Sequence, residues 1–598
     1  MPCLQALRTL SSAIVVVSIV SLTGMEKPAR AQTPADDAAR AARQFQGLQS
    51  EQERLRQLEE LQRTNRPPSG DVPAKPVPES AAKGERCFDI KTIKVEGAKL
   101  IADETIRATV AGWEGKCLGL TEINNVLKAL TFLYVEKGYI ASRAYLKPQK
   151  LTSGELAIAI VEGKLESIRV NGQADDRHIV ATAFPWMIDH SVNLRDLEQG
   201  IDQINRLRSN DAKTALAAGS QQGYSVLDVT NKPTSRFHAS VGTDNLGATV
   251  SGIYQSRVDM TLDNALGIND LWQFGYQMSN NRSPVYVSPE RPNSDTINGS
   301  VSIPYGYWLY GLDTTWSQYH SSVPGQIGPI NTDGGSTIIS PYLTRMLYRD
   351  QVSKLSATAR FTWKDTDNEI LGSRIDVASR TLSIAQFDLN YSRQVLGGQF
   401  AAGIGYQHGL DVLGAFKDFD APDGSPKGQF AKYTATLSYM RPFDLGPVTP
   451  VFSTFIMGQW TDDRLFGTEQ MSFGGYSTIR GVRDAILFAD KGALARNEFS
   501  LMLPAPPQAW LAQYVGRIEP YVAVDVGYAV PTNGYYSNTG AVVGTDGGKM
   551  IGVAAGVRNR GGKLAFDVWY AQLVARPDMP AATLPPTALV QGRISFSF

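Results

Sequence analysis

The chain ends in the stretch Ala588-Leu589-Val590-Gln591-Gly592-Arg593-Ile594-Ser595-Phe596-Ser597-Phe598, whose character alternates along its length. One face carries Gly592 and the apolar residues Ala588, Val590, Ile594, Phe596 and Phe598. The other face carries Gln591, Arg593, Ser595 and Ser597. A period of two predicts a β-strand with one apolar and one polar face. Such strands build transmembrane β-barrels, although a water-soluble sandwich shows the same alternation in shorter strands.

Residues 233–598 repeat this alternation, punctuated by Asn, Asp, Gly and Pro. We therefore expect an all-β transmembrane barrel over this range. At about 10 residues per strand, with loops of similar average length, the range accommodates about 16 antiparallel strands. An even number fits a single-chain bacterial barrel.

Residues 1–31 predict a secretory signal peptide. Arg8 supplies a positive charge, residues 10–22 form a short apolar run, and Ala29-Arg30-Ala31 provides a cleavage site before Gln32. The alternative is a membrane anchor helix, but the run is shorter than the roughly 20 residues that span a bilayer. The sequence thus predicts export.

Residues 32–66 predict a helix, because large apolar residues recur at three- and seven-residue intervals. These residues are Phe45, Leu48, Leu55, Leu58 and Leu61. Their stripe is thin, so the helix suits a solvated setting or a wet lumen. Residues 67–84 contain five prolines with Ser, Gly and Lys, which predicts a semi-rigid linker that lets the helix move.

Residues 85–162 and 163–232 form two copies of one predicted α/β unit with the order β-α-α-β-β. The first copy combines a strand at 90–95, a helix from Thr121 to Lys137, and strands at 142–146 and 155–161. Both copies place a Gly-Tyr pair before a strand, Gly138-Tyr139 and Gly223-Tyr224. Two unrelated small folds are the alternative.

The cysteines, the histidines and the charge balance indicate which sites and partners to expect. Of three cysteines, Cys3 lies in the predicted signal, which leaves Cys87 and Cys117 as a default disulfide in an oxidising compartment. The five histidines are scattered, so neither a metal site nor a cofactor is predicted. Lys plus Arg equals Asp plus Glu, 58 each, so no overall charge favours nucleic acid.

No motif indicates an enzyme. Gly403-Ile404-Gly405 lacks the third glycine of a dinucleotide-binding loop. Gly547-Gly548-Lys549 is followed by Met550, where a phosphate-binding loop needs Ser or Thr.

One stretch inside the barrel region, Phe473-Gly474-Gly475-Tyr476-Ser477-Thr478-Ile479-Arg480-Gly481, makes a poor strand or helix. Its paired glycines weaken regular structure. A loop carrying one arginine beside a glycine within a barrel indicates a backbone that folds back and presents a charge. An ordinary exposed loop is the alternative.

Residues 521–528 supply a partner for that charge. Alternation turns the valines of this segment toward lipid and turns Asp525 and Gly527 inward. The small residues Ala523 and Gly527 leave room beside the carboxylate. Glu498 also faces inward by alternation and is the rival partner.

The β-α-α-β-β units resemble POTRA domains. The whole mature chain resembles the TpsB transporters of two-partner secretion, of the ShlB/FhaC/HecB type, a branch of the Omp85 superfamily. The resemblance covers the N-terminal helix, the proline linker, two POTRA units and the barrel. Turn segments at 244–247, 262–270 and 302–308 are also similar to those of the family.

The resemblance gives the arginine loop a role. It corresponds to the family's loop 6, whose Val-Arg-Gly-Tyr/Phe motif is Ile479-Arg480-Gly481-Val482 here, preceded by Gly474-Gly475. In the superfamily this loop enters the lumen and its arginine pairs with a wall aspartate. The matching wall segment is Ala523-Val524-Asp525-Val526-Gly527, in which alanine replaces an aromatic residue. The terminal Phe598 resembles the signal read by the outer-membrane assembly machinery.

The resemblance implies a translocator in the outer membrane of a Gram-negative cell, with its POTRA domains in the periplasm. These would capture an unfolded TpsA-type exoprotein and pass it through the barrel without nucleotide hydrolysis, while helix 32–66 leaves the pore. The implied partners are this client, outer-membrane lipid and the barrel assembly machinery, with the transporter monomeric and without nucleic acid. The rivals are an Omp85-type assembly factor, which in its best-known form carries five POTRA units, and a passive porin, which needs none.

Overall fold

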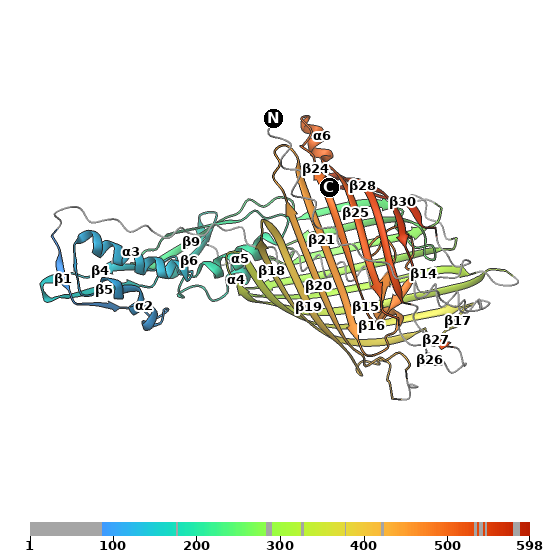
Figure 1. Cartoon of the computed structure of the whole chain (residues 1–598), viewed down its shortest axis with the longest axis horizontal. Helices are drawn as coiled ribbons and strands as arrows, with labels where there is room; N and C mark the ends of the chain where they lie inside the picture. The colour runs from blue at the N-terminus through green and yellow to red at the C-terminus, as the bar shows by residue number, and fades with distance from the viewer. Residues whose placement is uncertain are drawn as a thin grey trace, which may run out of the picture.

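The computed structural model describes residues 86–174, 178–282, 290–323, 328–376, 378–419, 424–531, 535–536, 542–543, 547–577 and 586–598. The predicted signal peptide (1–31), pore-plugging helix (32–66) and linker (67–84) lie outside the described residues. An elongated arm of two small α/β units leads into a large β-barrel (Figure 1).

The first unit is a three-stranded sheet covered by helices. Strand β5 (Glu155–Val161) lies between β2 (Thr92–Glu96), to which it is parallel, and β4 (Arg143–Leu146). Its alternate residues Leu156, Ile158 and Ile160 are buried in the core. The remaining elements are β1 (Phe88–Ile90), α2 (Asp103–Val110), the 3₁₀ turns η1 (Ala111–Trp113) and η2 (Leu151–Ser153), β3 (Lys116–Leu118) and α3 (Leu120–Glu136).

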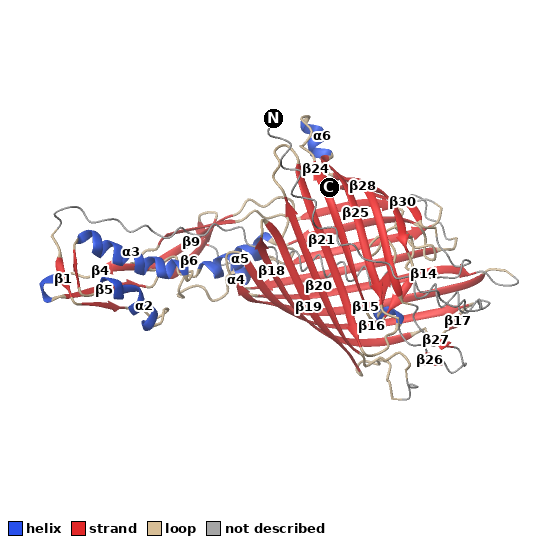
Figure 2. Ribbon diagram, in the orientation of Figure 1, coloured by secondary structure: helices blue, strands red, loops and turns tan. Residues whose placement is uncertain are grey.

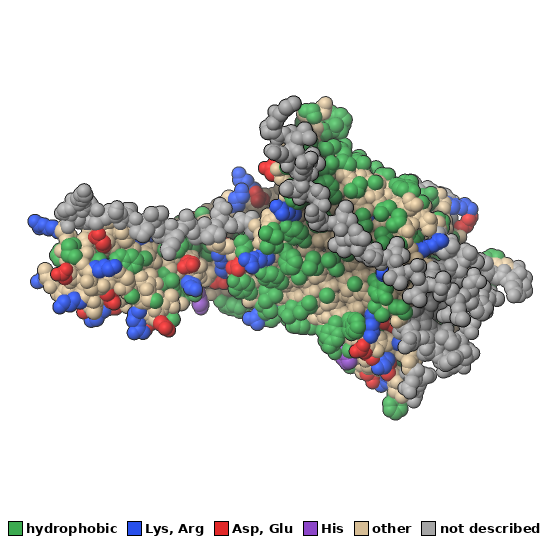
Figure 3. Space-filling view, in the orientation of Figure 1, with side chains coloured by type: hydrophobic (Ala, Val, Ile, Leu, Met, Phe, Trp, Pro, Cys, Tyr) green, Lys and Arg blue, Asp and Glu red, His purple; other side chains and the backbone are tan. Residues whose placement is uncertain are grey.

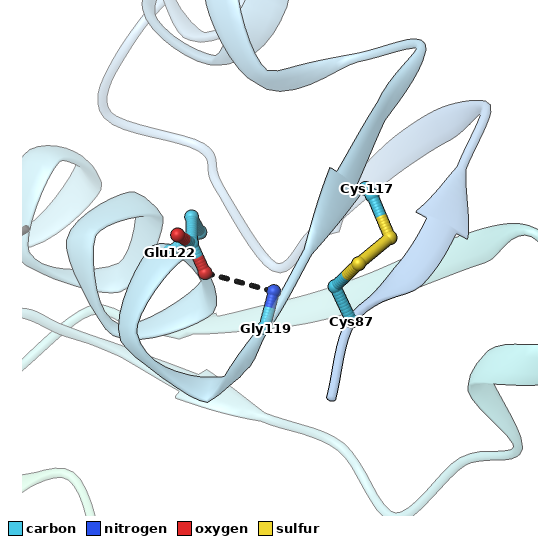
Figure 4. The surroundings of a disulfide bond; sticks show 4 residues. All are labelled: Cys87, Cys117, Gly119 and Glu122. Carbon is cyan, nitrogen blue, oxygen red and sulfur yellow. Dashed lines mark hydrogen bonds between the residues drawn. A yellow bond between two sulfur atoms is a disulfide. The ribbon is translucent and has the colours of Figure 1, made fainter. Parts of the chain in front are cut away.

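Helix α3 begins one residue earlier than the sequence predicts. The Glu122 carboxylate accepts a hydrogen bond from the Gly119 backbone N–H at 2.8 Å and closes the first turn (Figure 4). Just before it, Cys87, which precedes β1, forms a disulfide with Cys117 in the middle of β3, with their Cα atoms 5.3 Å apart (Figure 4). A cross-link that closes a loop of this size stabilises a fold by about 3–4 kcal/mol.

The second unit repeats the first. Its sheet has the order β7 (Gln173–Ala174), β6 (Lys164–Val170), β9 (Tyr224–Thr230) and β8 (Lys213–Ala218). The central pair is parallel and the following pair antiparallel, as in the first unit. Helices α4 (His178–Ala183) and α5 (Leu194–Asn205) cover it. Both units therefore have the β-α-α-β-β order that the sequence predicts.

The barrel is a closed ring of sixteen long antiparallel strands among the described residues. Figure 2 shows these strands side by side around the barrel. These strands are β10 (Phe237–Asp244), β11 (Tyr254–Asp263), β12 (Leu271–Asn280), β13 (Asn293–Tyr305), β14 (Trp308–Val323), β15 (Ile330–Arg349), β16 (Ser353–Ile370), β18 (Arg380–Val395), β19 (Gly398–Leu410), β20 (Ala431–Pro442), β21 (Thr449–Thr461), β24 (Gly492–Met502), β25 (Gly516–Ala529), β28 (Gly548–Gly561), β29 (Leu564–Ala575) and β30 (Ala588–Ser597). Pairing of β10 with β30, from Ser240 opposite Ser597 to Asp244 opposite Arg593, closes the ring. The predicted fold class is confirmed.

The strand faces follow the predicted alternation. On β25, Val522, Val524 and Val526 are exposed on the outside, whereas Ala523 and Asp525 are buried inside. The outer surface of the barrel is accordingly rich in apolar side chains (Figure 3). Within the described part of the chain, no helix is long and apolar enough to cross a membrane.

The segment between β21 and β24 folds inside the ring. It contains η3 (Gly467–Glu469) and a hairpin of β22 (Met471–Phe473) with β23 (Leu487–Ala489). The shorter elements elsewhere are β17 (Ser373–Arg374), α6 (Ala509–Tyr514), β26 (Tyr535–Tyr536) and β27 (Val542–Val543).

Candidate functional site: a loop anchored in the barrel lumen

The segment 462–491, called loop 6 from here on, is buried against the inner wall. Phe473, Ile479 and Val482 have no measurable exposure. They pack with Met550 of β28 and other wall residues in one hydrophobic cluster. The ordinary exposed loop that the sequence also allowed is therefore wrong, because these side chains are covered by the barrel.

The glycines of loop 6 allow its sharp turns. Gly474, Gly475 and Gly481 have φ of +112°, +99° and +108°, a backbone conformation that side chains disfavour. A Cβ at Gly481 would also lie 2.2 Å from the backbone nitrogen of Leu573 in β29. Glycine is thus required next to Arg480, both for its conformation and for its close approach to the wall.

Arg480 is bound to Asp525. Its Nε donates to Oδ2 and its Nη2 to Oδ1, both at 2.7 Å, and its backbone N–H donates to Oδ2 at 3.0 Å. Only 1% of the Asp525 side chain is exposed. The rival, Glu498, lies 3.5 Å from Arg480 Nη1 and makes a longer ion pair. The bidentate contact makes Asp525 the principal partner of Arg480.

Two wall glycines make room for the loop. A Cβ at Gly527 would lie 2.4 Å from Cδ1 of Ile479, and one at Gly552 would lie 2.0 Å from the Arg480 carbonyl oxygen. Gly527 thus accommodates the loop's side chains rather than the carboxylate itself. Ala523 packs in a cluster with Tyr521, to which Tyr476 of the loop is also packed.

Sequence reasoning missed Arg496, which also faces Asp525. Its Nη1 donates to the Ser477 carbonyl at 2.8 Å, and its Nε lies 3.6 Å from Asp525 Oδ1. Its place on the inward face of β24, opposite Asp525 in register, is the signal that could have identified it. Two arginines therefore compensate one buried carboxylate.

A row of oppositely charged side chains extends from Asp525 along the inner wall of the barrel. Arg558 of β28 bonds Glu498 and, at 2.7 Å, Glu519, which also pairs with Arg560. Positive and negative groups alternate from Asp525 to Arg560, so each buried charge has an opposite neighbour. Such compensation is what allows ionised groups to be buried.

A second anchor holds the start of loop 6. Glu469 accepts from Lys364 of β16 at 2.9 Å and from Lys432 of β20 at 2.8 Å, and all three side chains are buried. A cavity in the lumen is bordered by these three residues. The sequence did not predict this triad. Loop 6 is thus fixed by ion pairs to β16, β20 and β25, in separate parts of the wall.

A third contact joins loop 6 to the closure between β10 and β30. Arg483 Nη1 donates to the Asn245 carbonyl at 2.6 Å, and Asp484 accepts from the backbone and hydroxyl of Thr249. The Asn245 side chain in turn accepts from Gly592 N–H at 2.8 Å, and so extends the pairing of β10 with β30.

The second α/β unit is docked on the rim of the barrel. Asp202 of α5 accepts from Arg349 at 2.6 Å and from Lys354 at 2.8 Å. Gln203 donates to the Gly306 carbonyl at 3.0 Å in the turn between β13 and β14. Burial raises the pKa of Asp202, but the two cations outweigh burial and hold this pKa below its ordinary value.

The terminal Phe598 lies on the outer surface and is 68% exposed. Its backbone N–H donates to the Ala239 carbonyl at 2.9 Å, across the β10–β30 closure. Its role as an assembly signal stays a prediction. No cluster of three or more His, Cys, Asp or Glu side chains that could hold a metal occurs among the described residues.

Two POTRA-like units followed by a sixteen-stranded barrel with an anchored lumenal loop define an outer-membrane transporter. The family model described as haemolysin secretion/activation protein ShlB/FhaC/HecB matches residues 223–558. Two POTRA models, one of them ShlB-type, match residues 88–163 and 164–218. The chain belongs to this family of two-partner secretion transporters, with its barrel in the outer membrane and its POTRA domains in the periplasm.

Individual relatives support the same family assignment. The outer membrane transporter CdiB of Dickeya dadantii is 30% identical over 515 residues, which cover 86% of this chain and 87% of the relative. The hemolysin transporter protein ShlB of Serratia marcescens is 26% identical over 478 residues, covering 79% and 81%. A solved structure of CdiB from Escherichia coli matches with a TM-score of 0.78 at 30% identity, covering 95% of this chain and 99% of that one. The predicted resemblance is confirmed.

Proposed function

We propose that the protein binds an unfolded secreted exoprotein through its POTRA domains and exports it through the barrel without nucleotide hydrolysis. The relatives are named as transporters, of hemolysin in the case of ShlB, which supports an exported protein as the cargo. The transporter acts as a monomer, without a cofactor and without catalysis.

The observation that carries this proposal is the buried Arg480–Asp525 pair inside the lumen. Burying an ion pair brings little net stability, and a well-packed apolar pair often does as well. Its geometry instead specifies one position of loop 6 against the wall. A loop held by a few polar contacts can leave that position as a unit when a client enters.

The POTRA sheets offer docking sites for an extended chain. Strands β4 and β8 lie at the edges of their sheets, and β8 is largely exposed. An unfolded chain can add to such an edge as a further strand, because the edge presents unpaired backbone groups. Capture on the periplasmic side and folding on the outer side give export a direction without nucleotide.

Deletion of the gene tests the function. We expect one large exoprotein to disappear from the medium while the set of outer-membrane proteins stays unchanged. A general loss of outer-membrane proteins would instead identify an assembly factor. No change in either fraction would leave a passive porin and would contradict the proposal.

A further inference from the structure

The turn between β24 and β25 differs from the other turns on the periplasmic rim. Residues 503–515, Leu-Pro-Ala-Pro-Pro-Gln-Ala-Trp-Leu-Ala-Gln-Tyr-Val, contain no charged side chain. By contrast, the neighbouring turns on this rim, at 443–448 and 562–563, are six and two residues long. Within the long turn, helix α6 leaves Trp510 65% exposed and Tyr514 42% exposed.

The exposed aromatic residues continue the lipid-facing surface of the barrel. The Tyr514 ring stacks on the Phe596 ring of β30, with the ring centroids 6.4 Å apart. The Phe596 ring in turn contacts the Phe598 ring edge to face, with the centroids 5.0 Å apart. Helix α6 stands at the outer edge of the barrel wall (Figure 1), and the apolar surface extends over it (Figure 3). The patch therefore faces the side on which the membrane lies.

The turn is fixed to the strands that flank it. Leu503 N–H donates to the Ile518 carbonyl at 2.9 Å, and Lys563 N–H donates to the Gln513 carbonyl at 3.1 Å. Gly516, with φ of +71°, lies so close to Arg560 that a Cβ would be 2.1 Å from its carbonyl oxygen. Helix α6 is thus held in place and presents Trp510 outward.

The POTRA arm contacts other parts of the periplasmic rim. Among the described residues, its hydrogen bonds and ion pairs to the barrel fall on turns and strand ends from β11 to β16, through residues such as Asn269, Gly306 and Arg349. Trp and Tyr side chains combine an apolar body with a polar group and are enriched where membrane meets water. The Lys563 ammonium, 5.9 Å from the Tyr514 ring, adds a cation suited to lipid phosphate.

We propose that residues 503–515 form an interfacial foot that inserts Trp510 and Tyr514 into the periplasmic leaflet of the outer membrane. An uncharged segment that exposes Trp and Tyr beside the lipid-facing wall has the aromatic residues that are enriched at membrane–water interfaces. Through Tyr514 and Phe596, the foot holds the β30 side of the barrel closure at a fixed depth in the membrane.

A nitroxide label tests this placement in the full chain. Ala509→Cys, made together with Cys3→Ser so that the label has one target besides the Cys87–Cys117 disulfide, is reconstituted into phosphatidylethanolamine–phosphatidylglycerol vesicles. Val524→Cys on the lipid face of β25 and Leu266→Cys on an exposed rim turn serve as lipid and water references. We expect label 509 to lie between the two references and closer to label 524, with higher access to oxygen and lower access to a water-soluble nickel chelate than label 266.

The aromatic side chains are then removed. Adding Trp510→Asp and Tyr514→Asp should raise nickel access at label 509 severalfold toward that of label 266, with barrel heat-modifiability unchanged. Nickel access at label 509 equal to that at 266 in the parent chain would overturn the proposal. So would protection from both reagents, because that result places another protein surface on the foot.

Discussion

Arg480 makes three hydrogen bonds to a single carboxylate, and this contact decides where loop 6 lies. The second acidic residue, Glu498, is farther from Arg480 and also forms an ion pair with Arg558. Removing one member of a buried pair leaves the other without compensation, at a cost of about 3–5 kcal/mol. The two carboxylates should therefore respond differently to neutralisation.

Asp525→Asn should loosen loop 6 more than Glu498→Gln does. The asparagine keeps the shape but loses the charge that binds Arg480, whereas Arg558 keeps Glu519 at 2.7 Å after Glu498 is neutralised. Single-channel conductance in planar bilayers measures the effect as more frequent openings. Equal opening rates for the two variants would show that Asp525 has no special part in holding the loop.

Glu469→Gln should also increase channel opening, because it leaves Lys364 and Lys432 facing one neutral amide. The control is Glu155→Gln, which removes an exposed POTRA ion pair with Lys94. Exposed pairs of that kind contribute only about 0–1 kcal/mol. If Glu469→Gln conducted like the control, the second anchor would have no role in closing the lumen.

At the scale of single elements, helix α5 joins the POTRA arm to the barrel. Asp202 lies between Arg349 and Lys354, and Glu198 also reaches Arg349 at 3.2 Å. Because the pKa of Asp202 is lowered from its ordinary 3.8, the stability from its charge is fully present above that value. This stability is lost as the pH falls through the lowered pKa.

Docking of α5 should therefore be unchanged from pH 7 to pH 5 and should weaken only below about pH 4. A spin-label distance between the second POTRA unit and the barrel rim measures docking. Asp202→Asn should loosen docking already at pH 7, whereas the exposed Asp211→Asn should not. Loosening of the parent protein between pH 7 and pH 5 would assign docking to another titrating group.

The sequence predicts elements better than it predicts contacts between them. The two faces of β25, and hence the inward position of Asp525, follow from a period of two within one strand. The Glu469 triad could not be predicted, because Lys364 and Lys432 lie 105 and 37 positions away and only closure of the barrel brings them together. The start of α3 at Leu120 was missed because Glu122 reaches back to a glycine.

At the scale of the whole molecule, loop 6 connects the lumen to the barrel closure. Asn245 binds Arg483 of the loop and also extends the β10–β30 pairing. The same loop is anchored by Arg480 and Glu469 to three other strands. Movement of loop 6 would therefore affect both the passage through the lumen and the β10–β30 pairing that closes the barrel. This coupling suits a barrel through which a protein passes.

The most direct test of export through a loop-gated barrel is the amount of exoprotein that cells carrying Arg480→Ala release. We predict that secretion is lost while the barrel remains folded, heat-modifiable and present in the outer membrane. Arg374→Ala, at a site 57% exposed on the short strand β17, should secrete normally. Secretion by Arg480→Ala at the parent level would contradict the account.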